Sequence, residues 1–145
     1  MGLKWASIVA FVVLVLAIFG LVVRHSLFAR GSVAIAVQVV AFLLLLWARL
    51  TFGRRSFHAA ANPTEGGLVT TGPYRFLRHP IYSAILYFFW AGVLSHVSAV
   101  NCLLALLATA ALAVRMVTEE RLLVKRYPEY VAYAARTRRI IPFMF

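Results

Sequence analysis

Acidic side chains are scarce in this chain of 145 residues, which holds four Glu and no Asp against fifteen Lys and Arg. Cysteine occurs once, as Cys102 inside an apolar run, which excludes a disulfide framework and a cysteine-based zinc site. Charged residues make up only 13% of the chain and hydrophobic residues 63%, against roughly 45–50% in soluble domains. This composition excludes a soluble globular protein and a disordered one, and the length predicts a single domain, 1–145.

The charge that is present has one sign, with a net charge of +11 and a pI near 11.1. So basic a chain would suggest a nucleic-acid binder if it were soluble. In an apolar chain the same bias is typical of a membrane protein whose cytoplasmic loops are rich in Lys and Arg. We therefore predict a protein of the lipid bilayer, with no nucleic-acid partner and no metal site.

Apolar stretches between the charges predict an all-α integral membrane protein with four transmembrane helices, about 5–23, 31–49, 80–95 and 98–117. The first stretch is longer than the roughly 7–15 apolar residues of a cleaved signal peptide, so we expect a retained span. Residues 79–114 have no formal charge and would form one helix about 54 Å long, more than a bilayer requires. The polar residues 95–98 divide this region into a helical hairpin.

Four spans bring both termini to one side of the membrane, and that side then receives 13 of the 15 Lys and Arg. The positive-inside rule predicts that this side is the cytoplasm, in a prokaryotic inner or cell membrane. It holds the loop 51–79, the tail 118–145 and any site built from them. Apolar residues at helical spacing in the tail predict a C-terminal amphipathic cytoplasmic helix, which begins anew or kinks at Pro128.

One polar cluster, Gly-Pro-Tyr-Arg-Phe-Leu-Arg-His-Pro-Ile-Tyr at 72–82, lies at the start of the third predicted span. Pro80 suits the first turn of a helix, where its missing N–H costs nothing. Arg78 and His79 directly precede that turn, whose free N–H groups and positive dipole attract anions. The segment therefore predicts either an anion site or an interfacial anchor.

A second cluster, Glu119 and Glu120, contains half of the acidic residues and lies at the end of the fourth predicted span. Two carboxylates there oppose the helix dipole, so a cation should compensate them. Either Arg115 pairs with Glu119 four residues on, or a cationic ligand binds. Because a hairpin returns its ends to one membrane face, we expect this pair about 10 Å from Arg78 and His79.

A ligand with its own carboxylate and its own cationic centres fits between these clusters. S-adenosylmethionine is such a ligand, because it combines a carboxylate, an ammonium and a sulfonium. Aromatic residues nearby are candidates to hold the adenine or to face the sulfonium through cation–π contacts, namely Tyr74, Phe76, Tyr82, Tyr127 and Tyr130.

The gapped pattern Gly-Leu-Val-Thr-Thr-Gly-Pro-Tyr-Arg-Phe-Leu-Arg-His-Pro-Ile-Tyr (67–82), Glu-Glu (119–120), Tyr-Pro-Glu-Tyr (127–130) and Ile-Pro (141–142) resembles the isoprenylcysteine carboxyl methyltransferase family. The related phospholipid methyltransferases share Arg-His-Pro followed by Glu-Glu. The resemblance covers roughly 67–142 and implies an integral membrane methyltransferase with S-adenosylmethionine as cofactor. By this resemblance the cofactor-binding residues are Gly72, Pro73, Tyr74, Arg78, His79, Tyr82, Glu119 and Glu120.

The chemistry of the methyl acceptor stays open between two classes. A carboxylate acceptor is already ionised and needs no base, but it requires a cation to orient it, for which Arg126 or the run Arg136, Arg138 and Arg139 is available. An amine acceptor, as in a phospholipid N-methyltransferase, must lose a proton, for which Glu120 or Glu129 is the candidate base. The catalytic candidates are thus Glu120 and Arg126, and the acceptor is expected to be lipidic or of prenyl type.

A third hypothesis is a non-enzymatic small membrane scaffold or carrier, whose loop and tail only pack together. The sequence leaves the oligomeric state undecided. For the remaining polar residues we expect structural roles: His96 in the hairpin turn, Asn101 and Cys102 in helix packing, and His25 and His58 on the surface.

Overall fold

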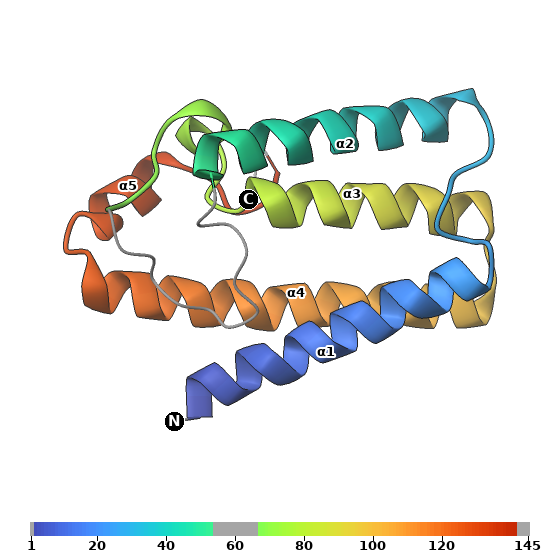
Figure 1. Ribbon diagram of the computed structural model, residues 1–145, viewed down its shortest axis with the longest axis horizontal. Helices are drawn as coiled ribbons and strands as arrows, with labels where there is room; N and C mark the ends of the chain where they lie inside the picture. Colours follow the sequence, from blue (N-terminus) through green and yellow to red (C-terminus); the bar gives the residue numbers. More distant parts are fainter. Residues whose placement is uncertain (1, 54–66, 142–145) are drawn as a thin grey trace.

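The computed structural model describes residues 2–53 and 67–141, which form helices joined by short connections (Figure 1). The α-helices are α1 (Gly2–Val23), α2 (Ser32–Phe52), α3 (Pro80–Ser95), α4 (Ala99–Arg126) and α5 (Tyr130–Arg136), with a short 3-10 helix η2 (Gly72–Arg75) before α3. The predicted all-α class is confirmed. His58 and Pro142 lie outside the described residues.

Three of these helices, α1, α2 and α4, are long and apolar enough to cross a membrane. The fourth expected span corresponds to α3, an apolar helix of 16 residues. At 1.5 Å per residue α3 is about 24 Å long, shorter than the roughly 30 Å hydrocarbon core. The structure therefore confirms three candidate spans and the helical hairpin, and the count of four spans stays a prediction.

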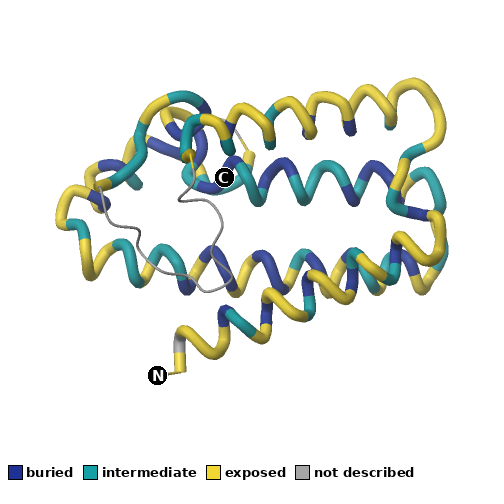
Figure 2. Tube along the Cα trace, in the orientation of Figure 1, coloured by how far each residue is buried: buried dark blue, intermediate teal, exposed yellow. Residues whose placement is uncertain are grey.

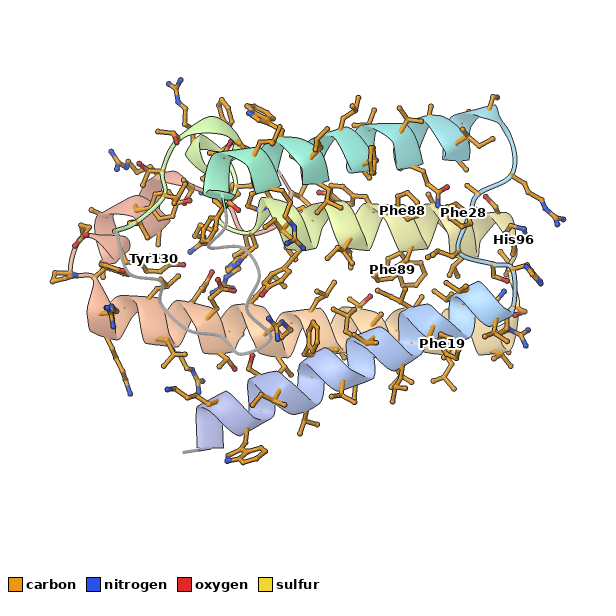
Figure 3. All side chains as sticks on the ribbon, in the orientation of Figure 1. Phe19, Phe28, Phe88, Phe89, His96 and Tyr130 are labelled. Carbon is orange, nitrogen blue, oxygen red and sulfur yellow. The ribbon has the colours of Figure 1, made fainter. Side chains whose placement is uncertain are left out.

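The helices pack as two antiparallel pairs, α1 against α4 and α2 against α3 (Figure 1). Small buried residues, Ala10 and Ala17 on α1 and Ala105 and Ala108 on α4, let the first pair approach closely. Phe89 on α3 is 1% exposed and joins the same core cluster, so it connects the two pairs (Figure 3). The outward faces of the helices are exposed and largely apolar, as lipid contact requires (Figure 2).

Polar side chains lock the end of the bundle opposite the loop and tail. The Gln38 amide donates to the carbonyls of Leu27 (2.7 Å) and Phe88 (2.9 Å), so it ties the α1–α2 connection to both helices of the second pair. Asn101 on α4 accepts from Arg24 (2.6 Å) and donates to Ser26 (2.9 Å). The packing role predicted for Asn101 is thus a set of hydrogen bonds between α4 and that connection.

The fourth helix extends beyond its expected end. A span of 98–117 followed by a separate tail helix was expected, whereas α4 continues to Arg126. Residues 118–126 contain no Gly or Pro and several good helix formers, so nothing stops the helix before Pro128. At 28 residues α4 is about 42 Å long, so about two turns extend past a hydrocarbon core of about 30 Å. Glu119 and Glu120 lie in this protruding part.

Candidate functional site

The loop before α3 folds back over the end of α2. Gly72 has a φ of 56°, and a Cβ atom there would lie 2.6 Å from Oγ1 of Thr51, so only glycine fits this turn. Pro73 and Tyr74 follow it in η2 and are buried. The ring of Tyr74 packs on Phe52 at a centroid distance of 5.5 Å. These contacts place the residues after η2 above the start of α3.

The C-terminal segment pairs with this loop through its backbone. Leu77 and Arg138 form a parallel β-bridge, in which the N–H of Arg78 donates to the carbonyl of Arg138 at 2.6 Å. The N–H of His79 donates to the carbonyl of Arg139 at 3.2 Å. Tyr133 on α5 donates its hydroxyl to the carbonyl of Tyr74 at 2.8 Å. The tail is thus held in register against the loop, with Arg139 beside His79.

Glu120 lies at the centre of three nitrogen-bearing side chains, those of two arginines and one histidine. Its Oε1 is 3.1 Å from Nε2 of His79 and 3.6 Å from Nη1 of Arg78. Arg139 donates from Nη2 to Oε2 at 3.0 Å and from Nε to both oxygens. The Glu120 side chain is only 12% exposed and that of His79 only 3%. Three segments that are distant in sequence therefore meet on one carboxylate.

The two guanidiniums and the imidazole keep Glu120 ionised. Burial by itself would raise the pKa of this carboxyl, but the hydrogen bonds from His79 and Arg139 and the charge of Arg78 outweigh it and lower the pKa to about 2. Such a group is a poor proton acceptor at neutral pH. Its physical effect is to hold Arg78, His79 and Arg139 together.

Glu119 has a different environment from Glu120. Its Oε2 accepts a hydrogen bond from the Tyr82 hydroxyl at 2.9 Å. The Tyr82 ring stacks on the imidazole of His79, with centroids 5.5 Å apart and planes 15° apart. The expected partner Arg115 instead donates to the carbonyl of Ser7 at 3.2 Å. The Tyr82–His79 stack connects the two neighbouring carboxylates of α4, because Tyr82 contacts Glu119 and His79 contacts Glu120.

Two buried donors at this end of the bundle lack a hydrogen-bond partner among the described residues. They are Nε of Arg78 and the hydroxyl of Tyr130, a residue on α5 labelled in Figure 3. Burial raises the pKa of Tyr130, so its hydroxyl stays protonated and able to donate. Unsatisfied buried donors are costly in a folded protein. At a polar cluster they fit a site that a ligand completes.

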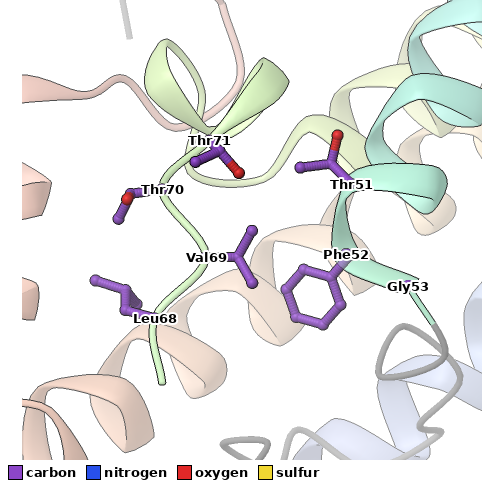
Figure 4. A pocket seen from close by; sticks show the side chains of 7 residues that line it. All are labelled: Thr51, Phe52, Gly53, Leu68, Val69, Thr70 and Thr71. Atoms are coloured by element: carbon purple, nitrogen blue, oxygen red, sulfur yellow. The ribbon is translucent and has the colours of Figure 1, made fainter. Parts of the chain in front are cut away.

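An open groove of about 470 Å³ lies beside this cluster, between the end of α2 and the segment before η2. Val69 and Phe52 face each other across it, whereas Leu68 and Thr70 point to the other side of the segment (Figure 4). Phe52 also packs on Tyr74 and is thus common to the groove and the loop. The lining residues are Thr51, Phe52, Gly53, Leu68, Val69, Thr70 and Thr71.

The structure brings together most of the residues that the sequence suggested for the site. Arg78, His79, Tyr82, Glu119 and Glu120 form one connected network. Gly72, Pro73 and Tyr74 shape the loop behind that network. Arg126 does not join this network: it is exposed at the end of α4, and its guanidinium lies 6.0 Å from the ring centroid of its neighbour Tyr127.

From the sequence, Arg139 was predicted only as one member of a basic run, and no position was predicted for the Tyr133 hydroxyl. Both positions depend on the tail turning back over the loop after Pro128. The turn itself is visible as Tyr-Pro in the sequence. Its direction is not, because a proline ends a helix without determining where the chain then runs.

Tyr133→Phe is expected to loosen the tail by about 1 kcal/mol, because it removes one buried hydrogen bond. Burial raises the pKa of Tyr133 from 10.0 to about 12. The stabilisation from this hydroxyl is therefore complete below pH 10 and is lost as the pH rises towards 12. Unfolding in detergent, followed from about pH 9 upward, should show a weaker alkaline loss of stability in the variant. Equal pH dependence in the two proteins would contradict this role.

Comparison with known proteins gives one curated relative. The chain is 37% identical over 76 residues to the cobalt-zinc-cadmium resistance protein CzcN of Cupriavidus metallidurans. The aligned region is 52% of this chain and 35% of that protein, so the chain matches about a third of the relative's length. No solved structure matches the chain.

The profile of the phospholipid methyltransferase family matches residues 28–130, from the α1–α2 connection to the first residue of α5. The match includes the loop with Arg78 and His79 and the carboxylate pair on α4. It confirms the family resemblance that the gapped motif indicated. Because the match covers more than half of the sequence, this chain belongs to the phospholipid methyltransferase family, whose activity is methyl transfer.

Proposed function

We propose that this protein is an integral membrane methyltransferase that uses S-adenosylmethionine and acts on a lipidic or membrane-associated small acceptor. The observation that carries the proposal is the network centred on Glu120, which unites Arg78, His79 and Arg139 at one end of an apolar helix bundle. A cluster of this kind at a boundary between apolar helices and basic segments suits a charged cofactor and an apolar acceptor. The proposal includes four spans, with the site on the cytoplasmic side.

The residues of the site fit the cofactor by the chemistry of their free atoms. Arg78 has an unsatisfied Nε donor that suits a carboxylate, and the Tyr130 hydroxyl is a second donor. Glu119 uses Oε2 for Tyr82, so its Oε1 is the candidate acceptor for an ammonium or a ribose hydroxyl. When bound, S-adenosylmethionine supplies a methyl group on a positively charged sulfur. The main contribution of these residues is then to align that methyl group with the acceptor.

The state of Glu120 favours an acceptor that is already ionised. A carboxyl with a pKa near 2, held by two guanidiniums and an imidazole, does not take a proton from an amine at neutral pH. A carboxylate acceptor needs no base, which supports chemistry like that of the isoprenylcysteine carboxyl methyltransferases. A phospholipid N-methyltransferase would need Glu129, an exposed residue directly before α5, as its base.

Titration of the detergent-purified protein with S-adenosylhomocysteine tests the proposal. We expect saturable binding with one site per chain, and weaker binding in Glu119→Gln because Oε1 no longer carries charge. Adenosine serves as the ligand control, since it lacks the carboxylate and the ammonium that the site is expected to hold. Absence of saturable binding in protein shown to be folded would refute the enzyme and favour the scaffold hypothesis.

A labelling experiment then separates the acceptor classes. Methyl-labelled cofactor is incubated with the protein and either membrane lipids or a prenylcysteine analogue. A methyl ester releases its label in mild base, whereas an N-methyl group does not. Base-labile label supports the proposed carboxylate acceptor, and base-stable label in lipid would establish the N-methyltransferase alternative instead.

A further inference from the structure

Arg115 is a buried cation at the end of the apolar part of α4. It is 4% exposed and lies between core residues of the same helix, with Leu112 on one side and Met116 on the other. An ionisable side chain in such a segment is costly, so its contacts point to what it does. It is not one of the residues that the family resemblance assigned to the cofactor.

The guanidinium of Arg115 is held by both neighbouring helices. On α1 its Nη1 donates to the carbonyl of Ser7 at 3.2 Å and to Oγ of Ser7 at 3.3 Å, and Ser7 is fully buried. It also lies over the ring of Phe11 at 5.1 Å. On α3 it lies over the ring of Tyr82, 5.8 Å from the ring centroid.

The contact with Arg115 acts on the ring that carries the Tyr82 hydroxyl. A cation over an aromatic face is attracted by the ring, so Arg115 holds the Tyr82 ring against α4. The Tyr82 hydroxyl donates to Oε2 of Glu119 at 2.9 Å. By fixing the ring, Arg115 also fixes the hydroxyl that contacts Glu119.

We propose that Arg115 is a positioning residue for the cofactor site. It acts through Tyr82 by orienting Glu119 so that Oε1 of Glu119 faces the cationic part of the ligand. The same contact keeps the Tyr82 ring stacked on His79, which in turn contacts Glu120. This inference rests on the proposed function.

The proposal also gives α1 a role in the site. The family profile begins at residue 28, after α1, and the sequence of α1 contains no matched motif. Through Ser7 and Phe11, α1 supplies the carbonyl and the aromatic face that hold the far side of Arg115. Without this support a buried guanidinium would have unsatisfied donors, so the helix pair α1–α4 maintains the geometry of Glu119.

A double-mutant cycle in the full chain tests this inference. Arg115→Met and Tyr82→Phe should each weaken S-adenosylhomocysteine binding about tenfold. The double variant should bind no more weakly than the worse single variant, because both changes break one connection. Arg115→Lys retains the charge and a donor and should recover part of the affinity. The same cycle in melting temperature without ligand should also be non-additive.

Leu112→Ala is the matched structural control, since Leu112 is 1% exposed on the same helix and belongs to the core cluster. It should lower the melting temperature and leave the dissociation constant of the folded protein unchanged. Additive losses in the cycle, or an Arg115→Met protein that melts early but binds normally, would overturn the positioning role alone. Failure of the unmodified protein to bind would overturn the proposed function and this inference with it.

Discussion

Glu120→Gln is expected to lower methyl transfer at least about 100-fold and to destabilise the fold by about 3 kcal/mol. The change conserves shape but removes the negative charge that His79, Arg78 and Arg139 share. The two guanidiniums and the imidazole are then left facing one another around an uncharged amide. Removing one member of a buried ion pair is costly because the remaining charge is desolvated without compensation.

Most of the expected loss of stability comes from Arg78 and His79, the partners of Glu120 on the loop before α3. His79 is 3% and Arg78 is 15% exposed, so water cannot replace Glu120 for them. Arg139 is 39% exposed and regains hydration when its contact is lost, so its share of the destabilisation is small. The loop should therefore separate from α4 before the tail separates from the loop. Transfer of label from methyl-labelled cofactor measures the loss of activity, and thermal unfolding in detergent measures the loss of stability.

Glu129→Gln provides the matched control, because it makes the same chemical change at an exposed carboxylate beside α5. We expect its ligand affinity and its free energy of unfolding to stay within experimental error of the unmodified protein. If Glu120→Gln bound ligand and unfolded as Glu129→Gln does, the network around Glu120 would not be an organising element of the site.

Gly92→Ala is expected to lower the melting temperature by on the order of 10 °C or to prevent folding. Gly92 lies on the face of α3 that contacts the α1–α2 connection. An added Cβ atom would lie 2.1 Å from the carbonyl oxygen of Leu27 and 2.8 Å from that of Ser26. These are backbone atoms, and Gln38 and Asn101 hold the same connection in place. The helix cannot accept the methyl group without moving away from its neighbour.

Gly20→Ala is the control for this second prediction. The Cβ atom there would meet only the side-chain end of Leu104, at 3.0 Å, which can turn aside. Alanine also has the higher helix propensity, by about 1 kcal/mol, so the two effects nearly cancel. Thermal unfolding of both variants in one detergent makes the comparison. Equal stability of the two would mean that α3 and the connection are not packed as closely as the structure places them.

Helix positions were predictable because they depend on local sequence. A long apolar stretch bounded by charges forms a helix in lipid whatever its neighbours, since each backbone N–H and C=O must be satisfied within the segment. The start of α3 at Pro80 and its end at Ser95 coincide with the expected span. The predicted end of α4, residue 117, was wrong by nine residues. The amphipathic residues 118–126 are compatible both with a separate surface helix and with continuation of the span.

Proximity within the site was partly predictable. The hairpin requires α3 to begin near the place where α4 ends, which brings Arg78 and His79 to the carboxylate pair. The partners of each carboxylate were not predictable, because they depend on side chains from α1 and from the returning tail. In the structure Arg115 contacts Ser7 and Tyr82, and Arg139 donates a hydrogen bond to Glu120.

Scarcity of acidic residues was the feature from which the site could be located in the sequence. The composition and the gapped Arg-His-Pro and Glu-Glu motifs by themselves determined an apolar helical protein and its family, because hydrophobic length and local motif spacing need no tertiary information. Only the tertiary structure distinguished the two neighbouring carboxylates. Glu120 is enclosed by Arg78, His79 and Arg139, whereas Glu119 accepts from Tyr82. Adjacent residues on a helix point in directions about 100° apart, so packing alone decides what each one meets.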